Sequence, residues 1–219
     1  MDMAIQLQPS DALLVIDVQN DFCPALGGMG GALAVAGGDE IVPLINALGR
    51  RFEHVLLTQD WHPRGHISFA SSHSGKQPYE QIEAMYGMQT LWPDHCVQGS
   101  AGAALHPGLD LPHVELILRK GFRREIDSYS AFLENDHVTP TGLAGYLRER
   151  GLTRLLLCGL AYDFCVRFSA VDGAAFGFDC VVIEDATRAV NLPGSVEATN
   201  TALADAGIPR VFSADLLTR

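Results

Sequence analysis

The fold of this chain is decided by residues 154–166, RLLLCGLAYDFCV. The stretch opens with an apolar run typical of a buried strand and closes at Cys165, where a helical pattern begins. A cysteine at the start of a helix meets the positive end of the helix dipole, which favours thiolate over thiol. Cys158 and Cys180 lie inside apolar runs and are interpreted as buried hydrophobic residues. Cys165 is therefore the candidate nucleophile.

Short apolar runs rich in Val, Ile and Leu recur on both sides of this stretch, and amphipathic segments lie between several of them. Strand and helix thus alternate, which predicts an α/β fold: an open, mostly parallel six-stranded sheet with helices on both faces, Rossmann-like in layout. The predicted strands are Ala12 to Ile16, His54 to Leu57, Val114 to Leu118, Arg154 to Leu157, Cys180 to Ile183 and Arg210 to Phe212, and the predicted helices lie near 41–52, 143–147, 166–174 and 195–205.

The organisation of the chain predicts one domain over residues 1–219, because no linker or change of composition marks a boundary. Two segments interrupt the alternation of strands and helices, namely Gly27 to Gly38 and Pro63 to Gly108. Loops of such length in a compact domain are usually functional. The glycines at 27–31 follow the first strand too late to cradle a pyrophosphate, so a nucleotide-binding Rossmann protein is disfavoured.

Charge and cysteine usage limit the partners. The formal net charge of -11 and the scattered basic residues argue against nucleic acid. Met1 to Ser10 does not resemble a signal peptide, and no apolar run approaches the roughly 20 residues of a membrane span. The five cysteines lack paired spacing, which favours a reducing cytoplasm. We therefore expect a small-molecule ligand. The sequence does not indicate the oligomeric state, so a homo-oligomer stays open.

Ionisable groups follow the predicted strands where each strand ends. Asp17 ends the first strand, Asp60 follows the second and Lys120 follows the third, while the fourth leads to Cys165. In an open parallel sheet the ligand site lies beyond these carboxyl ends. Asp17, Lys120 and Cys165 form a chemically coherent set, since a carboxylate can take the thiol proton and an ammonium stabilises both anions. Their alternatives are a turn cap for Asp17 and a solvated strand end for Lys120.

A second group of candidates lies in the long loop. Asp60 and His62 stand two residues apart, on the same side of an extended segment, and His95 follows further along. One carboxylate and two imidazoles suit Zn²⁺, Fe²⁺ or Mn²⁺, with coordination positions left open. His66 and His73 are competing candidates that we interpret as loop or supporting residues, and Cys96 could coordinate only by pointing to the same side as His95.

Five motifs in this order resemble those of bacterial nicotinamidases, which also hydrolyse pyrazinamide and belong to the isochorismatase-like cysteine hydrolases. The resemblance runs from about residue 10 to the C-terminus and is more specific than any single motif. The motifs are DVQNDF at 17–22, DWHP at 60–63 with HISF at 66–69, WPDHCV at 92–97, KG at 120–121 and GLAYDFCV at 159–166.

The resemblance implies a role for each matching residue. Cys165 would be the nucleophile, Asp17 the proton acceptor and Lys120 the charged third member. A divalent ion, Zn²⁺ before Fe²⁺ or Mn²⁺, would be held by Asp60, His62 and His95, with His66 left open. The Leu160-Ala161 bond would be cis. The backbone N–H groups of Ala161 and Cys165 would form an oxyanion hole. The substrate ring would be bound by Phe22, Trp92 and Tyr129.

The implied reaction is the hydrolysis of nicotinamide to nicotinate and ammonia through a cysteine thioester, as a step of NAD salvage. Pyrazinamide would be converted to pyrazinoate in the same way. An amidase acting on ureido or carbamoyl substrates would keep Asp17, Lys120 and Cys165 but gives no role to the Asp60, His62 and His95 set. A non-catalytic metal-binding protein with a redox-sensing Cys165 gives no role to Asp17 and Lys120. An isochorismatase proper lacks the catalytic cysteine.

Overall fold

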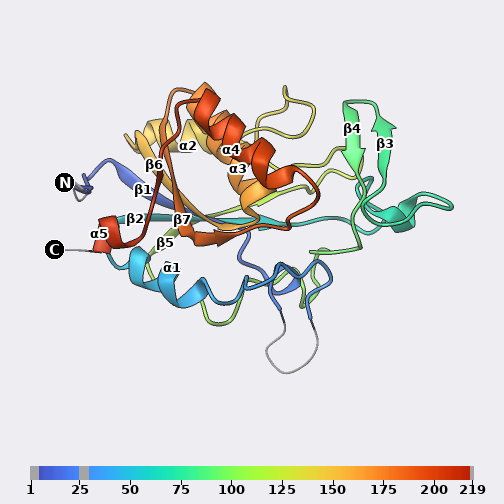
Figure 1. Cartoon of the computed structure of the whole chain (residues 1–219), viewed down its shortest axis with the longest axis horizontal. Helices are drawn as coiled ribbons and strands as arrows, with labels where there is room; N and C mark the ends of the chain where they lie inside the picture. The colour runs from blue at the N-terminus through green and yellow to red at the C-terminus, as the bar shows by residue number, and fades with distance from the viewer. Residues whose placement is uncertain (1–4, 25–29, 218–219) are drawn as a thin grey trace.

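The computed structural model describes residues 5–24 and 30–217, so residues 27–29 of the first predicted loop lie outside the described ranges. Its main element is a six-stranded sheet of parallel neighbours in the order β5-β2-β1-β6-β7-β8 (Figure 1). All six predicted strands are confirmed. They are β1 (Asp11–Ile16), β2 (His54–Asp60), β5 (Val114–Lys120), β6 (Arg154–Leu160), β7 (Asp179–Arg188) and β8 (Arg210–Val211).

Helices cover both faces of this sheet, as predicted (Figure 1). Helices α1 and α5 lie on one face, and α2, α3 and α4 lie on the other. Within the described residues, no helix is both long and apolar enough to cross a membrane. The helices are α1 (Val42–Gly49), α2 (Leu143–Glu149), α3 (Arg167–Ala175), α4 (Ser195–Asp205) and α5 (Ala214–Leu217), with short 3₁₀ turns at Asn20–Phe22 and Ala70–Ser72.

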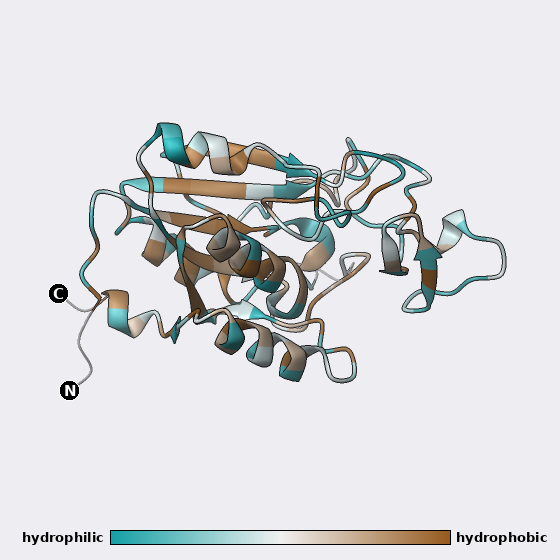
Figure 2. Ribbon diagram, turned by 90° about the horizontal axis from the view of Figure 1, so that it is seen from above, coloured by the Kyte–Doolittle hydropathy of each residue, from teal (hydrophilic) through white to brown (hydrophobic). Residues whose placement is uncertain are grey.

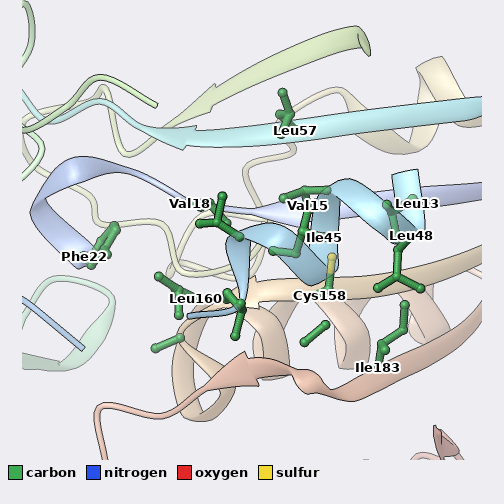
Figure 3. Packing of buried hydrophobic residues seen from close by; sticks show 14 of the residues in the cluster. Leu13, Val15, Val18, Phe22, Ile45, Leu48, Leu57, Cys158, Leu160 and Ile183 are labelled. Carbon is green, nitrogen blue, oxygen red and sulfur yellow. The ribbon is translucent and has the colours of Figure 1, made fainter. Parts of the chain in front are cut away.

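Strand β1 lies in the middle of the core because both of its faces are apolar. Leu13 and Val15 pack with α1 on one face (Figure 3). Leu14 and Ile16 pack with α2 and α3 on the other face. Colouring by hydropathy shows the same layering, with brown strands inside and teal segments towards the loops (Figure 2). A continuous apolar run rather than an alternating one is what burial on both faces requires.

Three features differ from the sequence-based expectations. Strands β2 and β5 continue beyond their apolar runs, so Asp60 and Lys120 are the last residues of their strands and pair with each other. Cys165 lies in a π-helical turn, Tyr162–Val166, and α3 begins only after it. The stretch from Pro63 to Gly108 contains an unpredicted antiparallel hairpin, β3 (Gln81–Ala84) and β4 (Gly87–Thr90). Its strands are too short and too polar to give a sequence signal.

The strand order brings the functional candidates together. Strand β1 lies between β2 and β6. The chain adds β2 and β5 on one side of β1 and later adds β6, β7 and β8 on the other side, so the strand order reverses at β1. Parallel register places Ile16 beside Gly159 and Asp60 beside Lys120. A crevice at such a switch of direction is the usual ligand site of an open α/β sheet.

Gly159 allows β6 to approach β1 closely at this edge. Its φ is +109, and a Cβ added there would lie 2.1 Å from the carbonyl oxygen of Ile16. We expect Gly159→Ala to lower the free energy of unfolding by about 2 to 5 kcal/mol, because it adds both a clash and backbone strain. Urea unfolding measures this loss.

The matched control is Gly145→Ala in α2, where an added Cβ meets nothing within 4 Å. Alanine in a helix interior should stabilise this variant by about 0.5 to 1 kcal/mol. Equal unfolding midpoints for the two variants would contradict the close approach.

Candidate active site

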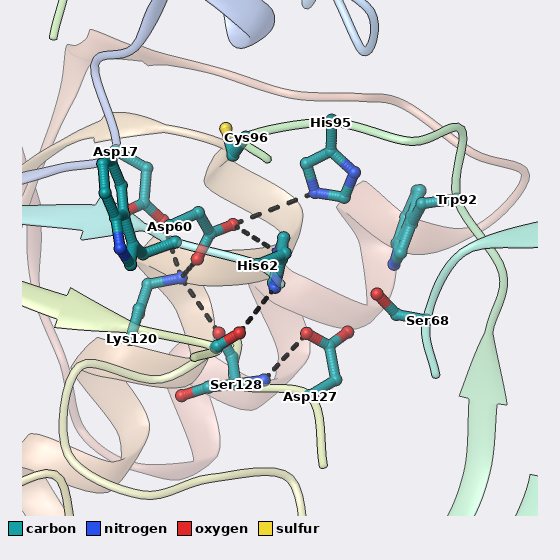
Figure 4. Close-up of polar contacts among 12 residues, drawn as sticks. Asp17, Asp60, His62, Ser68, Trp92, His95, Cys96, Lys120, Asp127 and Ser128 are labelled. Carbon is teal, nitrogen blue, oxygen red and sulfur yellow. Dashed lines mark hydrogen bonds and ion pairs between the residues drawn. The ribbon is translucent and has the colours of Figure 1, made fainter. Parts of the chain in front are cut away.

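The side chain of Lys120 connects the candidate nucleophile to the candidate metal ligands. Its Nζ lies 2.8 Å from Asp17 Oδ2 and donates a hydrogen bond to Asp60 Oδ1 (Figure 4). It also lies 3.4 Å from Cys165 Sγ. A fourth contact, 2.9 Å long, reaches the carbonyl oxygen of Ser128. The Lys120 and Asp17 side chains are completely buried. The three strand ends and the π-helical turn thus converge on one ammonium group.

The charges in this cluster stabilise one another. Burial lowers the pKa of Lys120, but Asp17 and Asp60 outweigh it and hold that pKa well above its usual value. Burial likewise raises the pKa of Asp60, and the cations Lys120 and His62 outweigh it, so the net shift is downwards. Lys120 is therefore an ammonium and Asp60 a carboxylate.

Asp17 and Cys165 are the two groups of this cluster whose pKa values show a net rise because of burial. Burial raises the pKa of Asp17 to about 6, although Lys120 opposes the shift. Thr58 fixes this carboxylate by donating from its hydroxyl to Oδ1 at 2.6 Å. Burial also holds the pKa of Cys165 well above its usual value, with Asp17 adding to the shift and Lys120 opposing it. Burial thus opposes the thiolate that the start of a helix favours, and Asp17 is placed to take the proton of the thiol.

Asp60, His62 and His95 converge as a metal site requires. The Nε2 atoms of His62 and His95 lie 3.5 and 4.0 Å from Asp60 Oδ2. The Nδ1 atoms of the two rings make hydrogen bonds with the carbonyl oxygens of Gly121, at 2.9 Å, and Pro93, at 2.8 Å. With Nδ1 donating to these carbonyl oxygens, Nε2 is the atom of each neutral ring that can bind an ion. These three buried residues can hold a divalent metal ion.

The other loop candidates are engaged elsewhere. His66 contacts Ser68 Oγ through Nδ1, at 2.7 Å, and the carbonyl oxygen of Ile126 through Nε2, at 3.3 Å. Its ring lies against that of His62, with centroids 4.3 Å apart. His73 Nε2 contacts the Ile67 carbonyl oxygen. Cys96 is fully buried and belongs to no potential metal cluster of the described residues. These contacts suit supporting roles for His73 and Cys96, whereas the role of His66 stays open, because it also forms a second potential metal group with His62 and Asp127.

A pocket opens between the thiol and the three metal-site residues, and its walls are aromatic. The indole of Trp92 packs edge-on against the ring of Phe164, with centroids 4.9 Å apart, and donates a hydrogen bond of 3.1 Å to the Tyr129 hydroxyl. The lining residues include all three side chains expected to contact a substrate ring, and the full set is Phe22, Leu33, Asp60, His62, Trp92, His95, Asp127, Tyr129, Ala161, Phe164, Cys165 and Val190.

Four of these lining residues were missed by sequence reasoning. Phe164 stands inside a quoted motif, next to the nucleophile, and could have been chosen for that reason. Leu33, Asp127 and Val190 lie in loops, where no periodic pattern indicates which side chains turn inwards. Only the tertiary structure brings them to the pocket.

The backbone before Cys165 has one feature that the resemblance implies. The peptide bond between Leu160 and Ala161 is cis. The carbonyl oxygen of Ala161 accepts hydrogen bonds from the N–H groups of Phe164 and Val166, both at 3.1 Å, and not from that of Cys165 between them. Both N–H groups expected to form an oxyanion hole, those of Ala161 and Cys165, belong to residues that line the pocket.

A buried thiol beside a carboxylate and an ammonium, at the carboxyl edge of a parallel sheet, is typical of a cysteine-dependent hydrolase. Sequence comparison agrees with this class, because an isochorismatase domain matches residues 11–214. The chain belongs to the isochorismatase family.

Within this family, the chain is similar to several nicotinamidases and pyrazinamidases. The chain is 52% identical over 206 residues to the nicotinamidase of Acinetobacter baylyi, covering 94% of each sequence. Its fold superimposes on a nicotinamidase/pyrazinamidase of Acinetobacter baumanii with a TM-score of 0.92, at 51% identity over 96% of this chain and 99% of that one. The pyrazinamidase of Pyrococcus horikoshii in complex with zinc gives a TM-score of 0.74, at 33% identity over 93% and 99%. The expected resemblance to nicotinamidases is confirmed.

Gly121 should be essential for the orientation of His62. Its φ is +65, and a Cβ added there would lie 2.4 Å from Cε1 of the His62 ring. We expect Gly121→Ala to turn this ring and to weaken Zn²⁺ or Mn²⁺ binding by about 10- to 100-fold, the usual cost of disturbing a ligand's support. Equilibrium dialysis with elemental analysis measures the affinity. Metal binding equal to that of the unmodified protein would contradict the assigned role of His62.

Proposed function

We propose that this chain is a nicotinamidase that hydrolyses nicotinamide to nicotinate and ammonia, a step of NAD salvage, and converts pyrazinamide to pyrazinoate. One observation carries the proposal: Lys120 joins a buried Cys165–Asp17 pair to the Asp60, His62 and His95 set at the base of an aromatic pocket. The near full-length similarity to the Acinetobacter enzymes supports the same conclusion.

The pocket would orient a flat heteroaromatic amide. Asp60, His62 and His95 would hold a divalent ion, which would supply a Lewis acid for the ring nitrogen and so help to orient the ring. Zn²⁺ is our first choice, given the zinc complex of the Pyrococcus relative, with Fe²⁺ and Mn²⁺ as alternatives. Phe22, Trp92 and Tyr129 would contact the ring, and burial of the pocket would exclude bulk water.

The protein's own residues would then carry out the covalent steps. Asp17 takes the proton from Cys165 Sγ, and the sulfur attacks the carbonyl carbon while Lys120 stabilises the anions. The tetrahedral intermediate collapses when Asp17 returns its proton to the nitrogen, so ammonia leaves and a nicotinoyl thioester remains. Water loses a proton to Asp17 and attacks the thioester, which releases nicotinate and restores the thiol.

Backbone donors would stabilise the charge that develops on the carbonyl oxygen. The N–H groups of Ala161 and Cys165 would donate to this oxyanion, and the loss of one such donor typically costs about 100- to 1000-fold in rate. The π-helical turn would serve this purpose because it directs the Cys165 amide away from the Ala161 carbonyl.

The other functions considered explain less of the site. A ureido or carbamoyl amidase leaves the convergence of Asp60, His62 and His95 without a purpose, and a redox-sensing binding protein leaves the Asp17 and Lys120 contacts without one. We infer a cytoplasmic location because the five cysteines are free and buried.

The nucleophile assignment is tested with Cys165→Ala. This variant should keep the circular dichroism spectrum of the folded protein and release ammonia from nicotinamide at least about 1000-fold more slowly, because the thioester cannot form. Cys180→Ala is the matched control, since Cys180 is buried at the start of β7 and lies outside the pocket. It should retain ammonia release.

Two results would count against this account. Turnover of nicotinamide by folded Cys165→Ala would remove Cys165 from the nucleophile role. Failure of the unmodified, metal-loaded protein to release ammonia from nicotinamide or pyrazinamide would overturn the proposed function itself.

A further inference from the structure

Asp127 is an acidic pocket residue that the proposed reaction does not use. Its side chain lines the pocket beside His62, and only 2% of the residue is exposed. Over residues 5–24 and 30–217, no Lys, Arg or His nitrogen lies within 4.0 Å of its carboxylate as an ion-pair partner. A buried carboxylate without a cationic partner is costly, so its presence in a pocket indicates a functional role.

Two neutral donors hold this carboxylate in place. The backbone N–H of Ser128 donates to Oδ1 at 2.8 Å, and Gln89 Nε2 donates to Oδ2 at 2.9 Å. Gln89 comes from the β3–β4 hairpin, is itself 1% exposed, and also donates to the Tyr129 hydroxyl at 3.1 Å. A carboxylate offers about four acceptor sites, so two protein donors leave Asp127 able to accept further hydrogen bonds from a ligand.

The position of Asp127 defines which part of a ligand it meets. Its carboxylate lies within 4.8 Å of ligand-type atoms of His62 and His66, whereas the sulfur of Cys165 lies within 4.8 Å of carboxylate oxygens of Asp17 and Asp60. In Figure 4 Asp127 and Asp17 lie on opposite sides of His62. A carboxamide held over Cys165 would therefore direct the opposite edge of its ring towards Asp127.

We propose that Asp127 is a specificity-determining residue that selects aromatic amides bearing an N–H donor on the ring edge opposite the carboxamide and rejects those bearing an anionic group there. The inference rests on the proposed amidase function and adds the class of substrate. A charged acceptor makes strong hydrogen bonds to an amino group. A second carboxylate in the same buried space meets like-charge repulsion.

The unmodified protein provides the first test. We would compare kcat/KM, measured by ammonia release, for nicotinamide carrying an amino group para to the carboxamide and for nicotinamide carrying a carboxylate at that position. The amino compound should be favoured by about 100-fold or more. Equal values, a preference for the carboxylate, or turnover of nicotinamide but of neither derivative would overturn the proposal.

Asp127→Asn provides the second test, because asparagine keeps the size and the acceptor for the Ser128 N–H but removes the charge. The preference for the amino compound should fall by about tenfold or more. Glu125→Gln removes an exposed charge from the same loop and should leave the preference unchanged. An undiminished preference in folded Asp127→Asn would overturn the proposal. Absence of ammonia release from nicotinamide itself would instead refute the proposed function.

Discussion

The buried ammonium of Lys120 is the interaction on which the rest of the site depends. It stands at the end of β5 and contacts carboxylates at the ends of β1 and β2, as well as the thiol of the π-helical turn. Alone, such a charge would be costly inside a protein. Asp17 and Asp60 beside it compensate the charge of the ammonium. The same contacts place the candidate nucleophile next to its candidate proton acceptor.

This arrangement separates two tasks within one pocket. Cys165 and Asp17 form the end where bonds would be made and broken, and His62 and His95 form the end where an ion would hold the ring. Asp60 belongs to both ends, because one carboxylate oxygen faces Lys120 and the other faces the imidazoles. The β3–β4 hairpin contributes through Gln89, which braces pocket residues from outside the main sheet.

Much of this could be predicted from sequence, and the exceptions have physical reasons. Apolar runs revealed all six strands because burial on both faces requires them, and the polar residues that end those runs meet at one edge by parallel register. The hairpin and Asp127 gave no signal, since short polar strands and loop side chains lack periodicity. The effect of burial on the pKa of the Cys165 thiol could not be predicted either, because desolvation depends on the packed structure.

The stability of Lys120→Met in metal-free protein tests the central role of this ammonium most directly. The substitution leaves Asp17 and Asp60 buried without their cation, so urea unfolding should show a loss of about 3 to 5 kcal/mol. Adding Asp17→Asn to the same chain should recover part of that loss, because one uncompensated charge is then removed. An unfolding free energy equal to that of the unmodified protein, or a double variant less stable than Lys120→Met, would contradict the account.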